Sequence, residues 1–216
     1  MTQKHNKTAA VYKNIVPLHT EISISSDRKG TKGMFDFTAI DFETAAGYIP
    51  CSLGIAVVRE NEVVHVENHL IKPICYPYFQ WYAQKIHGIH KEDVADAPTF
   101  DILWPQIEKY FNHTMLIAHN AAFDINVLRR TLAHYKIPRP QARYMCSYIL
   151  AKQAWRNNQK FSLDYLCNQE MIELDHHHSD SDAQACAKLL LKEAEVLKCE
   201  DFAQLRHVTQ IKSYRF

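Results

Sequence analysis

The first regular pattern along the chain is an alternation of apolar and polar positions in three successive segments. FDFTAIDFE (35–43) has strand character, SLGIAVVRE (52–60) is an apolar run rich in β-branched residues, and EVVHVENHLIKP (62–73) alternates as a strand does. The dipeptide Glu60-Asn61 is typical of a tight turn between the second and third segments. The pattern therefore predicts an antiparallel meander of three strands.

Beyond residue 78 the apolar spacing becomes that of helices alternating with short strands. The predicted helices cover residues 79–86, 99–112, 121–135, 147–155, 162–168 and 179–197, and the predicted strands lie in 115–120 and 142–150. Three antiparallel strands followed by strands that alternate with helices predict an α/β domain with a mixed sheet.

The composition along the chain also predicts how it is divided into domains. Residues 1–33 are polar and are predicted to form a loosely ordered N-terminal extension with a short helix near 12–18. Residues 34–200 are the predicted folded domain, and residues 201–216 are a C-terminal tail. Six scattered cysteines without a CxxC pair indicate reduced thiols. The start of the chain lacks the apolar region of a signal peptide, and LGIAVV (53–58) is too short to span a bilayer, so we expect a cytoplasmic protein without a membrane partner.

The net charge is +1, so no global field draws the protein to nucleic acids or acidic membranes. Any binding of a polyanion must therefore come from local charges or from bound metal. One stretch, 125–163, contains no Asp or Glu. It carries eight basic residues, Arg129, Arg130, Lys136, Arg139, Arg143, Lys152, Arg156 and Lys160, interleaved with the aromatic residues Tyr135, Tyr144, Tyr148, Trp155 and Phe161. This stretch either contacts a single strand through phosphates and stacked bases, or consists of solvated helix faces and core aromatics.

Four acidic residues stand at positions that suggest chemistry. Asp41 and Glu43 are two apart on the first strand, so their side chains share a face while Phe42 points into the core. Adjacent carboxylates repel each other unless a cation lies between them, which favours a hard divalent metal. Solvated acids at a strand end are the alternative. Asp124 and Asp182 each lie in the first turn of a predicted helix, where the helix dipole or a capping role explains an acid without any function.

The combination of motifs is more specific than any one of them. DFET (41–44), HNAAFD (119–124) and HHSDSD (177–182) occur in this order, and IHGIHKEDVADAPTF (86–100) lies between the first two. Together they resemble the motifs of the DnaQ-like 3′–5′ exonucleases of the DEDDh group, which includes the epsilon proofreading subunit of DNA polymerase III. The resemblance implies an RNase H-like fold: a five-stranded mixed sheet, with three antiparallel strands and then parallel ones, flanked by helices.

The resemblance also assigns roles. It implies that Asp41, Glu43, Asp124 and Asp182 hold two divalent metal ions, Mg²⁺ or Mn²⁺, that stabilise an in-line displacement at phosphorus. The third motif has four residues between its histidine and its aspartate, so counting back from Asp182 gives His177 as the general base.

Two neighbouring histidines are the alternatives to His177. They are His176 and His178, and the latter stands where a sister group has tyrosine, which excludes that variant. A zinc site built from the three histidines lacks a Cys/His pair at ligand spacing.

Three residues beside the acids are similar to substrate-binding residues of the family. Thr44 is placed like the residue that meets the 3′-terminal nucleotide, and His119 and Phe123 resemble residues that line the phosphate and base sites. Phe123 is equally suited to the core. The sequence departs from the commonest family pattern after Thr44, where Ala45-Ala46-Gly47 replaces Thr-Gly, which puts the contact with the terminal nucleotide in doubt.

These observations predict a metal-dependent 3′–5′ exonuclease that acts on single-stranded 3′ ends and releases nucleoside 5′-monophosphates. DNA is the expected substrate, in proofreading or repair. An RNA-trimming or oligoribonuclease-like enzyme and a catalytically silent nucleic-acid-binding member of the same fold are the alternatives. A DNA polymerase is a candidate partner, although the last residues, CEDFAQLRHVTQIKSYRF (199–216), contain no convincing sliding-clamp peptide.

Overall fold

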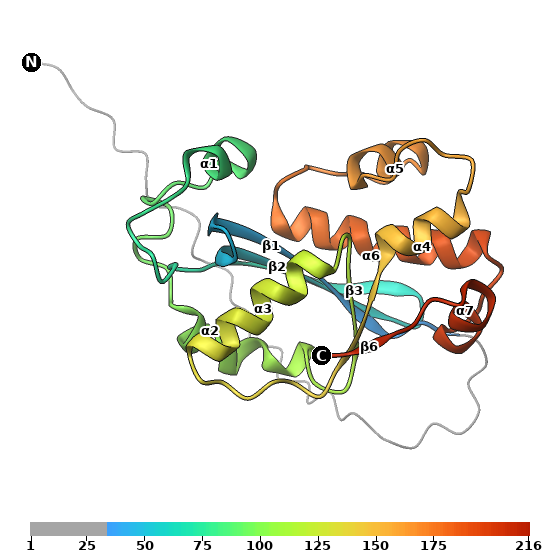
Figure 1. The fold of residues 1–216 in the computed structure, drawn as a ribbon, viewed down its shortest axis with the longest axis horizontal. Helices are drawn as coiled ribbons and strands as arrows, with labels where there is room; N and C mark the ends of the chain where they lie inside the picture. The colour runs from blue at the N-terminus through green and yellow to red at the C-terminus, as the bar shows by residue number, and fades with distance from the viewer. Residues whose placement is uncertain (1–33) are drawn as a thin grey trace, which may run out of the picture. The chain divides into compact units, whose positions relative to one another are not determined.

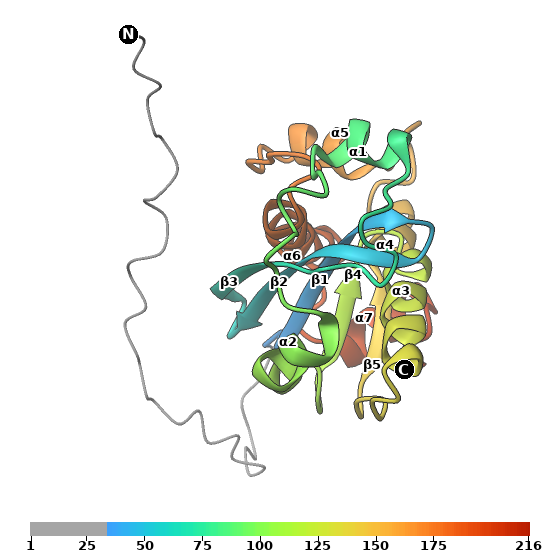
Figure 2. The same cartoon turned by 90° about the vertical axis from the view of Figure 1, so that its left-hand side faces the viewer.

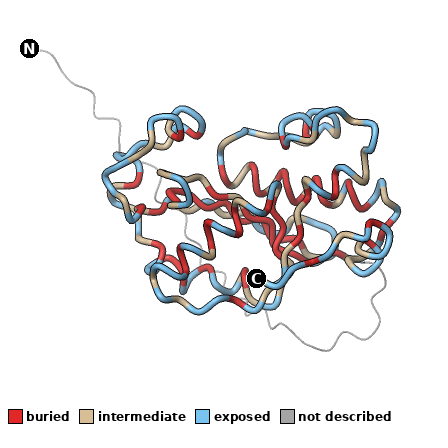
Figure 3. Tube along the Cα trace, in the orientation of Figure 1, coloured by how far each residue is buried: buried red, intermediate tan, exposed pale blue. Residues whose placement is uncertain are grey.

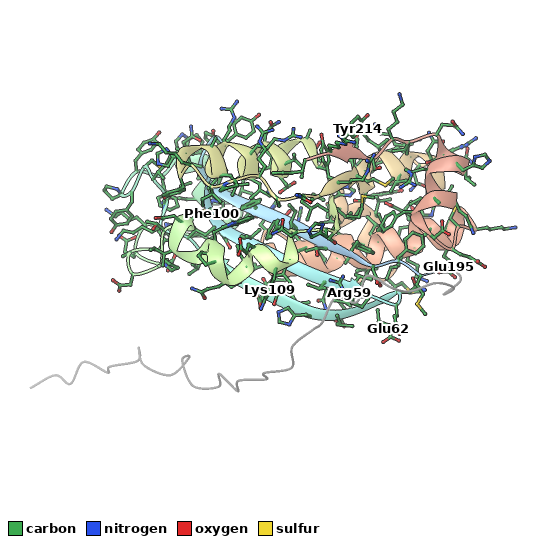
Figure 4. All side chains as sticks on the ribbon, turned by 90° about the horizontal axis from the view of Figure 1, so that it is seen from below. Arg59, Glu62, Phe100, Lys109, Glu195 and Tyr214 are labelled. Atoms are coloured by element: carbon green, nitrogen blue, oxygen red, sulfur yellow. The ribbon has the colours of Figure 1, made fainter. Side chains whose placement is uncertain are left out.

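A computed structural model describes residues 34–216, so the predicted helix near 12–18 lies outside the described residues. The meander is present as β1 (Phe37–Ala46), β2 (Ile49–Arg59) and β3 (Glu62–Leu70), paired in antiparallel register. Glu60 and Asn61 form the tight turn with φ angles of 53° and 68°, the left-handed conformation that suits a two-residue hairpin. Arg59 and Glu62, labelled in Figure 4, flank this turn and are opposite each other in the register of β2 and β3.

Three further strands extend the sheet from β1. β4 (Met115–Ala118) runs parallel to β1, β5 (Arg143–Cys146) runs parallel to β4, and β6 (Tyr214–Arg215) is antiparallel to β5. The strand order is β3-β2-β1-β4-β5-β6 (Figure 1). The predicted α/β fold with a mixed sheet is therefore confirmed, with six strands where five were expected.

The sixth strand comes from the segment predicted to be a tail. The Arg129 side chain donates to the Arg215 carbonyl oxygen at 3.0 Å and lies against the rings of Tyr144 and Phe216. Arg143 likewise bonds to the last residues through Ser213, at 2.9 Å and 2.7 Å. Part of the predicted basic stretch thus holds the end of the chain onto the sheet.

Helices cover both faces of the sheet. They are α1 (Trp81–His87), α2 (Phe100–Ile107), η1 (Glu108–Tyr110, a 3₁₀ turn), α3 (Ala122–His134), α4 (Ser147–Ala154), α5 (Leu163–Gln169), α6 (Ser179–Val196) and α7 (Phe202–Thr209). The side chains of α2 and α3 share one core cluster with one face of the sheet, and those of α4, α6 and α7 share another cluster with the opposite face. None of the helices in residues 34–216 is long and apolar enough to cross a membrane.

The alternation along β1 separates the two cores. Ile40 and Phe42 belong to the cluster with α2 and α3, and Phe37 and Ala39 belong to the cluster with α6. Figure 3 shows burial concentrated in the sheet and in α6, whereas α1 and α5 are largely exposed. Because side chains alternate, Asp41 lies on the α6 side of β1.

Candidate active site

Two acids come from the end of β1. Asp41 and Glu43 share a face of the strand, while Phe42 between them is buried among the residues of the opposite core, as the alternation predicted. The pairing of β1 with β2 shifts register directly after Glu43, at Thr44. The regular pairing of β1 with β2 is therefore interrupted directly after the two carboxylates.

The third acid is brought to β1 by α3. Asp124 lies in the first turn of this helix, and its side chain is 3% exposed. Its Oδ1 accepts a hydrogen bond from the Phe42 backbone N–H at 3.0 Å, which ties the helix to the strand between the first two acids. Asn120, with φ of 69°, makes the turn from β4 into α3.

The fourth acid depends on a close approach between α6 and β2. Gly54 pairs with Asp41 across the sheet, and a Cβ atom on Gly54 would lie 1.8 Å from the Ser179 carbonyl oxygen. The Ser52 and Ser179 hydroxyls are 2.7 Å apart, so a hydrogen bond closes the same contact. Because α6 begins directly on the backbone of β2, Asp182, one turn further on, reaches the acids of β1.

The four carboxylates form one electrostatic unit. Oxygen atoms of Asp41, Glu43 and Asp182 lie within 4.8 Å of one another. Burial raises the pKa of Glu43 to about 8, and the charges of Asp182 and Asp124 add to the rise. Burial also raises the pKa of Asp124 to about 7 and that of Asp41 well above its ordinary value, with further contributions from the other acids. Full ionisation would give the unit a negative charge that its own residues do not neutralise, so without a cation these acids tend to hold protons.

The donor set fits divalent cations. Within the described residues, every charged group that shifts the pKa of these three acids is another carboxylate. Buried carboxylates are stable when paired with cations, and hard cations such as Mg²⁺ and Mn²⁺ prefer oxygen ligands. Asp41, Glu43 and Asp182 could hold a metal ion, and Asp124 lies close enough to raise the pKa of Asp41.

The three histidines divide into two groups. His176 and His177 have ligating atoms within 4.8 Å of the Asp182 carboxylate, and their rings stack with centroids 3.8 Å apart. His178 precedes the first residue of α6, and its Nε2 lies 3.8 Å from the exposed Asp175. The structure therefore places His176 and His177 at the site and directs His178 away from it.

The profile of the RNase T exonuclease family matches residues 38–190, which contain all four acids and His177. The chain belongs to this exonuclease family. Membership confirms the predicted DnaQ-like exonuclease family.

Curated exonucleases match the same region. The 3′–5′ exonuclease DinG of Staphylococcus epidermidis is 28% identical over 188 residues, which cover 84% of this chain and 20% of that protein. The DinG protein of Staphylococcus saprophyticus is 25% identical over 187 residues, covering 82% of this chain and 20% of its own length. This chain thus spans about a fifth of the length of these relatives.

Solved exonuclease structures have the same fold. Exonuclease X in complex with 5′ overhanging duplex DNA superposes with a TM-score of 0.65 at 24% identity, covering 80% of this chain and 99% of that one. The nuclease domain of 3′hExo, a DEDDh family member bound to rAMP, gives 0.65 at 12% identity and covers 77% and 94%. Exonuclease I gives 0.64 at 18% identity, covering 80% and 42%. The predicted RNase H-like exonuclease fold is confirmed.

The predicted substrate residues lie around the acids in different settings. Thr44 is half-buried, and its carbonyl oxygen accepts a hydrogen bond from His87 Nε2 at 3.2 Å. The half-buried Phe123 ring lies 5.7 Å from the Tyr48 ring, measured between centroids. Both ring nitrogens of His119 already bond to protein, at 2.8 Å to the Ser147 hydroxyl and 2.8 Å to the Phe161 carbonyl oxygen. Substrate contacts by these three residues stay predictions.

Some residues that build the site were not predicted. Gly54 admits α6. The Asn68 side-chain oxygen on β3 lies 2.9 Å from the Ser52 hydroxyl and 3.1 Å from the Ser179 hydroxyl, and accepts from whichever of the two does not donate to the other. His87 accepts from the Ile89 N–H through Nδ1, which leaves a proton on Nε2 for the Thr44 carbonyl. The sequence did contain a signal for Gly54. It is a glycine inside the apolar run LGIAVV, and such a glycine often marks a place where another backbone approaches the strand closely.

Proposed function

We propose that this protein is a metal-dependent 3′–5′ exonuclease that releases nucleoside 5′-monophosphates from single-stranded 3′ ends, with DNA as the preferred substrate. The observation that carries the proposal is the convergence of Asp41, Glu43, Asp124 and Asp182, with His177 beside the last of them. Membership in an exonuclease family and similarity to DinG proteins named as 3′–5′ exonucleases support it.

In this proposal the four carboxylates bind two divalent ions, Mg²⁺ or Mn²⁺. Such a pair stabilises the attacking and the leaving oxygen of an in-line displacement at phosphorus. The residues of the chain supply the geometry: β1 presents Asp41 and Glu43, and the Asp124 bond to Phe42 N–H fixes α3 beside them. Asp182 completes the set through the contact of α6 with β2.

His177 is the proposed general base that takes a proton from the attacking water. Burial lowers the pKa of His177, and the neighbouring His176 lowers it further. The imidazole is therefore neutral near pH 7 and able to accept a proton. The His177 backbone N–H donates to Asp182 Oδ2 at 2.9 Å, which fixes the loop carrying the base to a metal-binding carboxylate.

Thr44 and Phe123 are the proposed contacts for the 3′-terminal nucleotide, because both lie next to metal-binding acids and are partly exposed. His119 is a proposed lining residue that also fixes the segment around Phe161 through its bond to that carbonyl. A DNA polymerase is a proposed partner on the strength of the resemblance to the epsilon subunit alone.

The test compares matched single-stranded DNA and RNA oligonucleotides, labelled at the 5′ end, in Mg²⁺, Mn²⁺ or EDTA. Wild type is compared with Asp124→Asn and with Asp101→Asn, because Asp101 also occupies the first turn of a helix, α2, but is exposed and is not among the charges that raise the pKa values of the acid cluster. We expect a ladder shrinking from the 3′ end with metal, retained in Asp101→Asn and absent in Asp124→Asn. The faster substrate identifies the preferred sugar.

Several outcomes would contradict the proposal or part of it. Cleavage that persists in EDTA, or that survives in Asp124→Asn, would remove the metal site from the reaction. Binding without cleavage under either metal would favour the catalytically silent member of the fold. Faster cleavage of RNA would transfer the assignment to an RNA-trimming enzyme with the same chemistry.

A further inference from the structure

The segment that joins β3 to α2 carries an unusual number of exposed rings. Residues 68–91 contain no Asp or Glu. Four aromatic side chains in this segment are exposed: Tyr76, Tyr78, Trp81 and Tyr82. Trp81, at 67% exposure, is a large apolar side chain left in solvent, and a cluster of such rings marks an interaction site on a soluble protein.

Lysines lie over two of these rings. The Lys85 ammonium is 4.9 Å from the Trp81 ring centroid, and the Lys72 ammonium is 4.8 Å from the Tyr76 ring centroid. The rings together with these two lysines are called the aromatic surface below. Flat rings combined with positive charge, in a stretch (68–91) without Asp or Glu, complement a polyanion that carries flat bases.

The aromatic surface is fixed to the strand that carries the catalytic acids. The Gln80 N–H donates to the Ala45 carbonyl oxygen at 2.8 Å, two residues beyond Glu43. The Gln80 side-chain oxygen accepts from the Gly47 N–H at 3.0 Å and from the Tyr82 hydroxyl at 2.6 Å. Figure 2 shows α1 beyond one end of the sheet, on the same side as α5. The rings of α1 therefore have a set position beside the end of β1.

We propose that the aromatic surface binds the single-stranded part of the substrate upstream of its 3′-terminal nucleotide. Bases stack on Trp81 and Tyr82, while Lys85 contacts phosphates; the Lys72 ammonium donates to the Ala95 carbonyl oxygen at 2.7 Å and adds positive charge beside Tyr76. The inference rests on the proposed exonuclease function, because it takes the nucleotides upstream of a 3′ end held at the metal-binding carboxylates to pass over α1. Since every base has a flat face, this contact is tolerant of sequence.

The occupant is argued from charge and from position. A negatively charged nucleic-acid strand is attracted to the lysines of a stretch that has no Asp or Glu, whereas an uncharged apolar partner would desolvate the Lys85 ammonium. The hydrogen bonds of Gln80 make the surface continuous with the site, so a strand held at its 3′ end has the rings within reach.

The test measures binding without turnover. Fluorescein-labelled oligothymidylates of 3 and 12 nucleotides are titrated in EDTA and followed by fluorescence anisotropy, using wild type, Trp81→Ala, Trp81→Phe and Ile102→Ala. Ile102 on α2 is the matched control, because it is 61% exposed and lies outside the segment. Loss of a stacking ring should raise the Kd for the 12-mer roughly 5- to 150-fold in Trp81→Ala. Trp81→Phe retains a ring, so this variant and Ile102→Ala should bind the 12-mer with a Kd close to that of the wild type.

The outcomes separate this inference from the proposed function. Weaker binding in Trp81→Ala supports the inference even if the protein cleaves nothing, since the assay needs no metal and no turnover. An unchanged Kd for the 12-mer in Trp81→Ala would overturn it, even in an active exonuclease. Concentration-dependent dimers in sedimentation velocity, lost in Trp81→Ala while DNA binding is retained, would assign the surface to a second copy of the chain and overturn it as well.

Discussion

His176 and His177 approach the same carboxylate with different groups. His176 places its ring Nδ1 3.0 Å from Asp182 Oδ1, whereas His177 donates its backbone N–H to Oδ2 and leaves its own ring free of that bond. A base must keep a nitrogen available for the substrate water, and His177 meets this condition better. His176 is placed to orient Asp182.

An alanine series across the three histidines separates these roles. We expect His177→Ala to lower kcat by about 10²–10⁴-fold with little change in KM, the usual effect of losing a general base. His178→Ala should stay near wild type, because that side chain lies beside Asp175 rather than at the site. Steady-state kinetics on one oligonucleotide would measure both. A larger loss of kcat in His176→Ala than in His177→Ala would move the base to His176.

Glu193 is a buried acid that the proposed reaction does not use. Its side chain in α6 is fully buried, and neither carboxylate oxygen has a hydrogen-bond partner within the described residues. Burial raises the pKa of Glu193 well above its ordinary value, so folding favours the protonated form. This acid therefore destabilises the folded protein as the pH rises.

Replacing Glu193 should stabilise the protein. We expect Glu193→Gln to raise Tm at pH 8 and to change it less at pH 5, because the protonated acid and the amide are both uncharged. Glu195→Gln is the matched control, since Glu195 is on the same helix but exposed (Figure 4), where surface changes are usually within about 0.5 kcal/mol. Thermal unfolding at the two pH values measures the effect. Equal shifts of Tm in the two variants would show that burial of Glu193 does not destabilise the folded protein.

At the level of elements, the contact of α6 with β2 decides whether the four acids meet. The atoms facing Gly54 are backbone atoms of Ser179 and Asp180, which cannot rotate away as a side chain can. A methyl group there must push the first turn of α6 off the sheet. Asp182 lies in that turn, so its distance from Asp41 depends on the absence of a side chain at residue 54.

Gly54→Ala should therefore reduce activity and stability together. We expect kcat/KM to fall about 100-fold or more, the cost of misplacing a catalytic group by about 1 Å, and stability to fall by about 1–3 kcal/mol from overpacking. Gly47→Ala is the control: its φ of 56° makes the variant strained, but no atom lies within 4 Å of the added Cβ. A Gly54→Ala enzyme with unchanged kcat/KM would show that α6 does not need this approach.

The elements differ in how far the sequence predicts them. The meander and its Glu60-Asn61 turn follow from local alternation and turn chemistry, and both are observed. β6 has only two residues, too few for a pattern, and its position depends on Arg129 and Phe216 meeting across the fold. The predicted helix over 99–112 is α2 followed by a 3₁₀ turn, because propensity alone does not fix where a helix ends.

For the molecule as a whole, the acid cluster links stability to pH and to metal. The pKa of Glu43 rises from an ordinary value near 4.5 to about 8, so the folded protein holds a proton that the unfolded chain releases. Unfolding then releases protons, and the stability of the metal-free protein falls as pH rises between these two values. Divalent ions bind the ionised carboxylates, so they oppose this loss.

We expect Tm in EDTA to fall between pH 5.5 and pH 8, and Mn²⁺ to raise it most at pH 8. Metal at 100 times its Kd contributes about 2.7 kcal/mol, or roughly 5–11 °C for a chain of this size. Asp41→Asn should behave oppositely: more stable than wild type in EDTA at pH 8, and unresponsive to Mn²⁺. Thermal unfolding of both proteins gives the comparison. A wild type whose Tm ignores Mn²⁺ at pH 8 would contradict the metal site.

The site as a whole shows what a sequence can and cannot supply. The spacing of Asp41 and Glu43 predicts a shared face, which the strand has. Spacing alone does not decide which of the three adjacent histidines is the base. The directions of their side chains depend on the positive φ of His177 and on where α6 begins. The contact at Gly54 joins residues 125 positions apart, and no local pattern encodes its partner.

The order of synthesis gives the contact at Gly54 a further consequence. Asp41, Glu43 and Asp124 are made well before residue 179, and the helix that supplies Asp182 packs against β1 and β2 from far along the chain. Such non-local contacts form late in folding. A growing chain on the ribosome, or a product of premature termination before residue 179, therefore carries three of the acids without an assembled centre. The set of four acids is therefore complete only after residue 182 has been made.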